Sequence, residues 1–258
     1  VLSITFATCI TPKLRAQEIA PEVKHSFSIG AEGGWAWSQQ SGSFETSCKC
    51  GHFAGGTGNS GTGALFFEFE LDKYFSFGAK LGLDQLSTSS SFLMVDTSTL
   101  VYDNGTKIAT AAVHENLSSS ISIAYLFVAP YVTFTPFGQG LFIRIAPEFG
   151  SLTSSNITAT REIQTPIILS SGDTIRNADF QNGTSKETLE NGPIQGVNKL
   201  RIAVLFSAGY DIPIWNNFSI FPEASYNLPL TNVSNSAQST NWKIASYGLS
   251  VGVKYRFY

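Results

Sequence analysis

The chain has 258 residues, of which 43% are hydrophobic, 13% aromatic and only 14% charged, and its formal net charge is −3. A disordered chain would carry more charge and fewer aromatic residues, and a nucleic-acid-binding protein would usually be basic. A membrane-spanning helix needs about 20 consecutive apolar residues, whereas the longest apolar run here extends from Ile123 to Ala129 and ends at Pro130.

Residues 1–17 have the composition of a processing signal rather than of a folded element. The first ten residues are apolar but too few to span a bilayer, and more polar residues follow them. This pattern predicts the remnant of a secretory signal peptide, truncated at its start and cleaved near Ala16 or Gln17, with a frayed strand or helix as the alternative. Residues 18–24 are then expected to form a short periplasmic segment ahead of one domain, residues 25–258.

Apolar residues alternate with polar or small ones through eight segments of the chain. In the third segment, for example, Phe75, Phe77 and Ala79 fall on one face. A period of two sustained over about ten residues is typical of a β-strand with two different faces. The predicted strands are 25–37, 63–71, 74–86, 119–134, 141–152, 198–212, 218–228 and 242–257.

The connections between these segments alternate in length. The short ones are 72–73, 135–140 and 213–217, and the long ones are 38–62, 87–118, 153–197 and 229–241. Every short turn therefore falls at one end of the predicted sheet, and every long loop at the other. This arrangement, with an even number of strands, is typical of an up-and-down outer-membrane β-barrel.

Two of the long loops carry local signals of structure. The Asp-Asn-Gly sequence at 103–105 is typical of a hairpin turn, so the connection over 88–118 is expected to extend outward as a β-hairpin. The stretch 174–192, which contains the charged residues 186–190, is expected to hold a short helix on a solvated surface.

The two faces of the predicted strands differ in chemistry. One face is apolar on nearly every strand, and if it meets lipid, the charged face lines the lumen. Opposite charges must pair there, because an isolated buried charge is costly. An eight-stranded lumen is just wide enough to be filled by side chains, so we expect an ion-pair network and no open pore. The predicted lumen residues are Glu32, Glu68, Glu70, Lys80, Asp84, Arg144, Glu148, Arg201, Asp211, Glu223, Lys254 and Arg256.

Aromatic residues gather near both ends of the predicted strands. Such girdles mark the two interfaces of a membrane, whereas a soluble barrel would bury its large apolar side chains in a wide dry core. The set beside the short turns is Tyr74, Phe75, Phe77, Phe134, Phe137, Phe142, Tyr210, Trp215, Phe218, Tyr255 and Phe257, and the smaller set near the long loops is Trp35, Trp37, Phe149, Tyr226 and Trp242. We therefore assign the apolar face to lipid.

Three prolines, at positions 130, 147 and 222, lie inside predicted strands. Proline cannot donate to the hydrogen-bond ladder, and a closed barrel has no free edge to accommodate it. We therefore expect β-bulges at these positions. A bulge beside Pro130 would also shift the apolar phase from Tyr125 before it to Val132 after it.

The last predicted strand alternates large apolar residues, at Leu249, Val251, Val253, Tyr255 and Phe257, with small and basic ones. This pattern resembles the C-terminal assembly signal by which outer-membrane proteins are handed to the barrel-assembly machinery. The chain from about residue 25 onward resembles the eight-stranded outer-membrane barrels of the OmpA and OmpX type. In its glycine-rich strands and Pro-Glu motifs it is most similar to barrel-domain families of Bacteroidetes- and Chlorobi-like bacteria.

The resemblance implies an all-β fold: an eight-stranded antiparallel up-and-down transmembrane β-barrel with long extracellular loops and short periplasmic turns, placed in the bacterial outer membrane. The implied partners are outer-membrane lipids, the barrel-assembly machinery during biogenesis, and an external ligand or surface of unknown identity. We expect a monomer that needs no cofactor and binds no nucleic acid.

The sequence Cys48-Lys49-Cys50-Gly51-His52 lies in the first long loop. Two thiolates and an imidazole suit zinc or copper, but no fourth ligand is evident. A disulfide between Cys48 and Cys50, or two free thiols, is favoured, because a C-x-C sequence lacks the paired spacing of zinc motifs. We therefore expect no metal site.

A hydrolase would need a nucleophile within hydrogen-bond reach of an oriented base. His114 and Glu115 are close in sequence to Ser118, Ser119 and Ser120, but nothing in the spacing demands a catalytic arrangement. We expect no catalytic residues and a role in envelope structure, adhesion or surface binding through the outer loops. The alternatives are a small-molecule channel, a lipid-modifying hydrolase and a soluble lipocalin-like binder.

Overall fold

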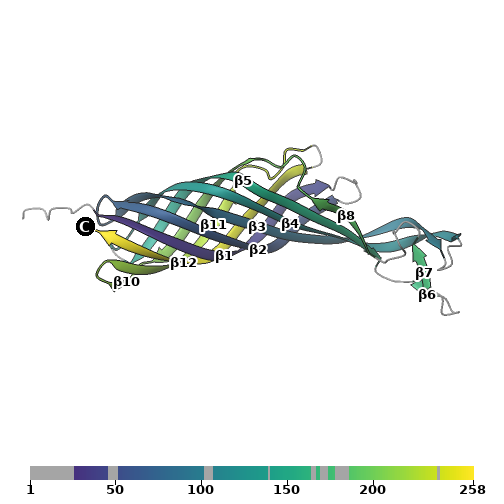
Figure 1. Ribbon diagram of the computed structural model, residues 1–258, viewed down its shortest axis with the longest axis horizontal. Helices are drawn as coiled ribbons and strands as arrows, with labels where there is room; N and C mark the ends of the chain where they lie inside the picture. Colours follow the sequence, from purple (N-terminus) through teal and green to yellow (C-terminus); the bar gives the residue numbers. More distant parts are fainter. Residues whose placement is uncertain are drawn as a thin grey trace, which may run out of the picture.

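The computed structural model describes residues 26–45, 52–101, 107–138, 140–163, 167–168, 174–177, 186–236 and 239–258 (Figure 1). Every helix or strand assigned within these residues is a β-strand. Over the same ranges, no helix has the length and apolar character needed to cross a bilayer. The expected signal remnant 1–17, the segment 18–24, and the pair Cys48 and Cys50 lie outside the described residues.

Eight long strands form a closed antiparallel ring. They are β1 (Phe27–Glu45), β2 (His52–Glu70), β3 (Phe75–Val101), β4 (Lys107–Phe134), β5 (Leu141–Ile163), β9 (Leu200–Tyr210), β11 (Phe218–Pro229) and β12 (Ser239–Phe257). Each strand pairs with the next one around the ring, and β12 returns to pair with β1, where Phe257 lies opposite Phe27. The predicted eight-stranded antiparallel barrel is confirmed.

Four further short strands, within the described residues, lie outside this ring and pair with its strands or with one another. They are β6 (Ile167–Ile168), β7 (Thr174–Asn177), β8 (Lys186–Gly192) and β10 (Ile212–Trp215). No helix forms in the described parts of the stretch 174–192, where a short helix was predicted: 174–177 is β7, and β8 runs antiparallel to the outer part of β5. The ladder hydrogen bonds with β5 satisfy the backbone of this segment, so local helix preference does not decide its structure.

The two ends of the barrel differ in length and shape (Figure 1). The short turns lie at the end that carries the C-terminus, and the strands extend far at the other end. The expected loop 38–62 is mostly strand, since β1 continues to Glu45 and β2 begins at His52. The hairpin expected over 88–118 is confirmed, because β3 and β4 stay paired until Val101 lies opposite Lys107.

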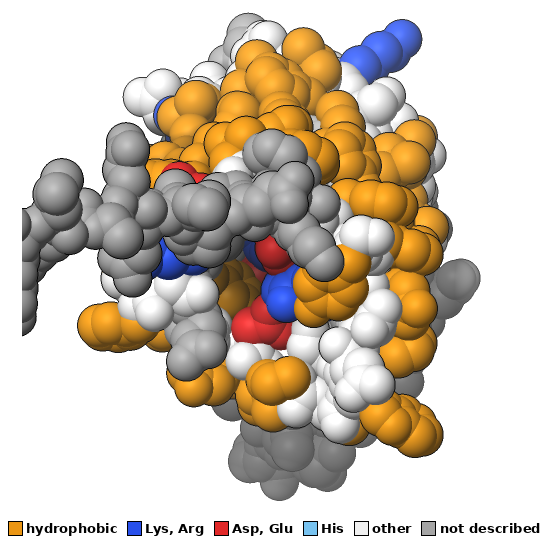
Figure 2. Space-filling model, turned by 90° about the vertical axis from the view of Figure 1, so that its left-hand side faces the viewer, with side chains coloured by type: hydrophobic (Ala, Val, Ile, Leu, Met, Phe, Trp, Pro, Cys, Tyr) orange, Lys and Arg blue, Asp and Glu red, His pale blue; other side chains and the backbone are white. Residues whose placement is uncertain are grey.

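Near the short turns the outer wall of the barrel is apolar. Leu81 and Leu83 of β3 are 56% and 57% exposed, and Val132 of β4 is 50% exposed. Figure 2 shows hydrophobic side chains around the outside of this end and charged ones inside its mouth. The outward apolar residues of β3 run from Phe75 to Leu83, close to the roughly 9–11 residues with which a tilted strand crosses a bilayer.

Beyond Leu83 the faces of the same strands exchange their polarity. On the outer face of β3, Gln85 and Ser89 follow Leu83, and on the inner face Leu86 follows Asp84. The inner side of the outer half holds a hydrophobic core of Phe44, Phe53, Leu86, Leu117, Ile121, Ile123, Tyr125, Ile157, Ile194, Val233, Trp242 and Ile244. This half therefore has the polarity of a water-soluble barrel.

The prediction of β-bulges at the three prolines is wrong. Pro130 lies opposite Ala79 of β3 with no change of register, and the β4–β5 register is the same on both sides of Pro130 and Pro147. The two prolines face each other across β4 and β5, so their missing N–H groups interrupt the ladder at one shared place. Pro222 likewise pairs with Val251 without a shift.

Two members of the predicted outward-facing aromatic sets point inward. Phe142 is 5% exposed and Trp242 is 1% exposed, so both point into the barrel and not toward its surroundings. Tyr125 is also inward, while Val132 is outward, because β4 keeps its alternation through Pro130. The apparent change of apolar phase thus reflects aromatic residues on the inner face and not an extra residue in the strand.

Candidate functional site

The lumen of the half near the short turns is filled by charged side chains. All twelve residues assigned to the lumen lie on the inner face of the wall or at its rim, and each makes an ion pair with another member of the set. Strand alternation explains their shared face, since every second residue of a strand points the same way.

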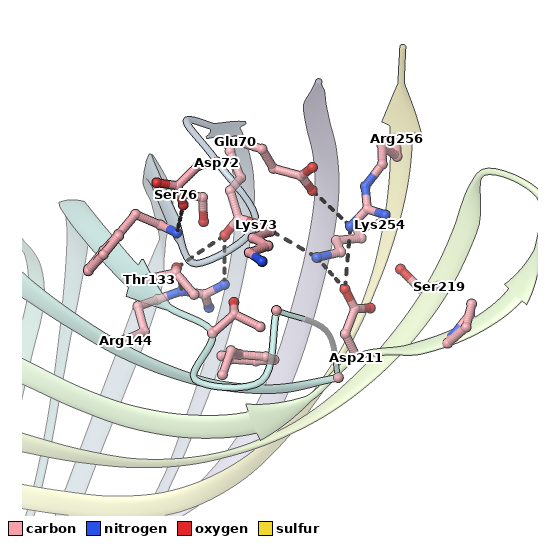
Figure 3. A pocket seen from close by; sticks show the side chains of 17 residues that line it. Glu70, Asp72, Lys73, Ser76, Thr133, Arg144, Asp211, Ser219, Lys254 and Arg256 are labelled. Atoms are coloured by element: carbon pink, nitrogen blue, oxygen red, sulfur yellow. Dashed lines mark hydrogen bonds and ion pairs between the residues drawn. The ribbon is translucent and has the colours of Figure 1, made fainter. Parts of the chain in front are cut away.

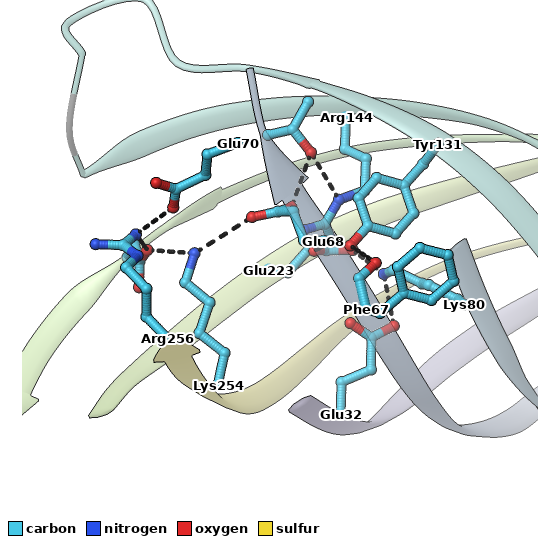
Figure 4. Close-up of polar contacts among 12 residues, drawn as sticks. Glu32, Phe67, Glu68, Glu70, Lys80, Tyr131, Arg144, Glu223, Lys254 and Arg256 are labelled. Atoms are coloured by element: carbon cyan, nitrogen blue, oxygen red, sulfur yellow. Dashed lines mark hydrogen bonds and ion pairs between the residues drawn. The ribbon is translucent and has the colours of Figure 1, made fainter. Parts of the chain in front are cut away.

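Glu223 of β11 connects two cations at the centre of this network (Figure 4). Its carboxylate lies 3.0 Å from the Lys80 ammonium and 2.6 Å from the Arg144 guanidinium. Lys80 also lies 2.6 Å from Glu32, and Arg144 lies 3.3 Å from Glu68. All five side chains are less than 10% exposed, so each charge depends on its partners for stabilisation.

Toward the mouth the network continues through two further cations. Lys254 lies 3.5 Å from Glu68 and 2.5 Å from Asp211. Arg256 lies 2.8 Å from Glu70 and 3.8 Å from Asp211, and its side chain is 32% exposed. The exposed fraction of the charged side chains therefore rises from the centre of the network to the rim. The stabilisation that each ion pair contributes falls in the same direction.

A second charged cluster lies on the other side of the central network, toward the outer half. One nitrogen of Arg201 donates to Asp84 at 2.9 Å and to Glu148 at 2.6 Å, and the other donates to the Asn227 amide oxygen at 2.9 Å. The Asn227 amide nitrogen then donates to Glu148 at 2.9 Å. Asn227 was not among the predicted lumen residues, although alternation in the predicted strand 218–228 places it on the same face as Glu223.

Aromatic rings fill the lumen between these charges. Tyr131 and Phe142 lie beside the Arg144 guanidinium, which is 4.3 Å and 5.0 Å from their ring centres. Four inward rings each lie directly opposite a glycine on the paired strand: Phe66 and Gly30, Tyr131 and Gly78, Phe142 and Gly209, and Phe221 and Gly252. A Cβ atom on any of these glycines would collide with the ring.

The charged layers, the rings and the hydrophobic core of the outer half are stacked along the barrel axis. The core is closed by Ile194, Val233 and Trp242, which come from the connections and from the start of β12. Three different kinds of side-chain packing therefore occupy the lumen. This arrangement matches a filled interior and not a water-filled passage.

A cavity of about 350 Å³ opens at the end with the short turns (Figure 3). Its lining contains four acids, Glu68, Glu70, Asp72 and Asp211, and four bases, Lys73, Arg144, Lys254 and Arg256. The lining is therefore balanced in formal charge. Over the residues that the structure describes, no group of three or more His, Cys, Asp or Glu side chains is arranged to hold a metal ion.

At the opposite end, the β3–β4 hairpin extends past its neighbours (Figure 1). On its side away from β4, β3 pairs with β2 only up to Ser89, and with β7 only at Leu100 and Val101. Over 90–99 no described strand forms a ladder with this edge, although Phe53 and Gly56 of β2 lie beside Phe92 and Ser90 at its start. Leu93 and Val95 on the same segment are 68% and 59% exposed.

The hypothetical hydrolase residues do not come together. His114 is exposed on the outer face of β4, whereas Glu115 is fully buried on the inner face, where it lies 3.7 Å from Arg161. Neighbouring residues of a strand point to opposite faces, so this pair cannot form a histidine–carboxylate dyad on one surface.

The residues of the predicted assembly signal lie on β12, which closes the ring against β1 and β11. Leu249, Val251 and Val253 face outward and are between 47% and 60% exposed. Tyr255 and Phe257 stand next to each other at the end with the short turns, where Phe257 stacks on Phe27.

No protein-family model matches the chain, and no curated protein matches it. Among solved structures, the chain is similar to Neisserial surface protein A, with 13% identity and a TM-score of 0.31 over 90% of this chain and 97% of that one. It is also similar to Ail, the attachment invasion locus protein of Yersinia pestis, with 10% identity and a TM-score of 0.28 over 90% and 99% of the two chains. The N-terminal β-barrel domain of Pseudomonas aeruginosa OprF has 12% identity and a TM-score of 0.31 over 89% and 97%.

Proposed function

We propose that this barrel is an integral protein of the bacterial outer membrane that holds a binding surface, the protruding β3–β4 hairpin, outside the cell. The observation that carries the proposal is the contrast between a filled lumen and an extended sheet with an open edge. Over the described residues, charged, aromatic and apolar side chains fill the lumen, whereas β3 between Ser89 and Leu100 has no described ladder partner besides β4 and carries the exposed side chains of Leu93 and Val95.

The apolar wall supports the membrane setting. Outward-facing Leu, Ile, Val and Phe side chains on every long strand would be in contact with water if the barrel were soluble, and such a continuous patch far exceeds that of ordinary monomers. We take the exchange of polarity beyond Leu83 as support for an outer boundary of the lipid at that level. The role of the last strand as an assembly signal remains a prediction.

The hairpin edge favours an extended polypeptide as the external partner. An added strand gains main-chain hydrogen bonds along the edge, and side chains such as Leu93 contribute specificity. Non-catalytic surface binding fits this geometry better than hydrolysis, since His114 and Glu115 lie on opposite faces of β4.

The membrane setting is tested by fractionation and by gel mobility. Washed outer membranes are extracted with mild detergent, and the protein is run on SDS gels with and without boiling. A folded barrel in the membrane fraction migrates differently before boiling. A soluble protein with no mobility shift would contradict the proposal.

The surface role is tested on cells that display the barrel. Replacing Leu93 and Val95 by lysine blocks strand addition at the edge, because charged edge residues oppose pairing. We expect weaker adhesion of these cells to protein-coated surfaces, while Ser120→Lys on the same sheet, away from the edge, leaves adhesion unchanged. Equal adhesion of all three, or single-channel conductance of the purified barrel in a planar bilayer, would favour another function.

A further inference from the structure

An apolar groove runs along the outer wall of the barrel where β1, β2, β11 and β12 meet. Its volume is about 480 Å³, its walls include Ile29, Leu65, Phe218 and Val253, and its floor includes Ala31. These four wall residues are between 47% and 66% exposed. The groove lies on the part of the wall that the proposed function assigns to the membrane, and the inference below rests on that assignment.

Small residues follow the groove along β1 and β2 toward the outer half. Gly33 of β1 lies directly opposite Gly63 of β2, two residues beyond the pair Ala31 and Leu65. Gly61 follows, opposite Trp35. The groove and these small residues together cover the outer wall from Ile29 to Trp35, about 20 Å at roughly 3.3 Å per residue.

The outward glycines differ from the inward glycines in what surrounds them. A Cβ atom on Gly34 or Gly248, which face the lumen, would collide with the neighbouring strand. On Gly33 and Gly63 it would meet only one carbonyl oxygen at 3.9 Å, and on Gly61 it would meet nothing within 4 Å. Packing within the protein therefore accounts for the inward glycines but not for the outward ones.

Glycine weakens a strand, because it loses more conformational entropy on folding than other residues and packs no side chain. Inside a strand it often marks a place where a ligand or another backbone approaches closely. Three such residues bordering one apolar groove point to a molecule that lies against the wall.

We propose that the groove holds one hydrocarbon chain of a membrane lipid. Within the bilayer core, acyl chains are the surrounding solvent, and the groove walls are apolar side chains. A second copy of the barrel fits less well, because a symmetric dimer would bring this concave surface against the same concave surface. The length of the groove suits a linear chain that follows the strands.

The test fills the groove without disturbing the strands. Gly33→Val and Gly63→Val are combined in one variant, since valine is favoured in strands and its Cβ has room at both positions. The control is Ala208→Val, at an exposed position on the outer face of β9, away from the groove. Each barrel is purified from membranes in mild detergent, and the lipids that remain bound are counted by native mass spectrometry.

We expect the wild type and the Ala208→Val variant to retain one lipid on most barrels. In the double glycine variant, most barrels should lose the lipid, because the two valine side chains occupy the place of the hydrocarbon chain. Equal retention in all three proteins would overturn the proposal. A dimer in the wild type that dissociates in the double variant would also overturn it, in favour of a second copy.

The same samples separate this inference from the proposed function. Membrane retention and heat-dependent gel mobility report the location and the fold, whatever lipid is bound. Unchanged mobility with unchanged lipid retention would reject only the acyl-chain site. Loss of the mobility shift in the wild type would reject the membrane setting on which the site depends.

Discussion

The half of the barrel near the short turns and the half beyond Leu83 share the same strands, but the polarity of their inner and outer faces is opposite. In the first half, apolar side chains face outward, and the inner face carries charges such as Arg144 and Glu223. In the second half, serine and threonine face outward, and residues such as Leu117 and Ile121 form a dry core. The comparison shows that the outer face of one strand can change from apolar to polar along its length while successive side chains continue to alternate between the two faces.

The two halves differ in what stabilises them. The outer half is stabilised by the burial of apolar surface away from water. In the proposed membrane setting, the first half gains little from apolar burial, because lipid chains are as apolar as its outer wall. The first half must therefore depend on the ion pairs of its inner face. Removal of one charged partner there should lower the free energy of unfolding more than the other changes considered below.

The largest effect is expected from breaking the central network. Arg144→Met leaves Glu68 and Glu223 each with one cation fewer in a buried place, so the free energy of unfolding should fall by about 3–5 kcal/mol. Urea unfolding of the barrel in lipid vesicles measures this change. Arg256→Met at the exposed rim is the matched control and should cost about 1 kcal/mol or less. Similar losses in both variants would mean that water enters the network.

The next effect locates the boundary between the halves. Ala79→Arg places a charge midway along the outward segment Phe75–Leu83 and should lower the unfolding free energy by about 2–4 kcal/mol. Ser89→Arg, on the same face of β3 but beyond the boundary, should change it by no more than about 0.5 kcal/mol. The pair is measured by the same urea unfolding, and equal losses would move the boundary outward past Ser89.

A smaller effect compares the two kinds of apolar contact. Ile121→Val removes one buried carbon from the core of the outer half and should cost about 0.5–1.5 kcal/mol. Ile143→Val makes the same change on the outer wall, where lipid can fill the space, and should stay within about 0.5 kcal/mol. A thermal or urea titration of the two variants side by side decides whether the outer wall meets lipid.

The smallest effect is expected from salt. Raising the ionic strength from 0.1 M to 1 M shortens the Debye length from about 10 Å to about 3 Å, but it screens buried pairs far less than exposed ones. Unfolding free energy should therefore change by less than about 1 kcal/mol, with the rim pair of Arg256 and Glu70 as its main source. A drop several times larger would show that ions reach Lys80 and its partners.

Strand alternation made the ring, its inner charges and its outer wall predictable from the sequence. It could not tell which acid meets which base, because Glu223 and Lys80 come from strands on different sides of the lumen and meet only after the barrel closes. It also misled at Pro130, where inward aromatic residues were taken for a change of phase. The polarity exchange beyond Leu83 was missed because period-two alternation is the same whichever face is apolar.

The four pairs of an inward ring and a glycine have a consequence for how the chain finds its register. Each pair joins the two strands of one outer hairpin: β1 with β2, β3 with β4, β5 with β9, and β11 with β12. A slip of two residues would keep every face correct, so polarity alone cannot oppose it. Such a slip would, however, bring Phe66 against Ser28 or Glu32, whose side chains occupy the space that Gly30 leaves open. Each hairpin thus carries its own steric check of alignment, which can act before the barrel closes.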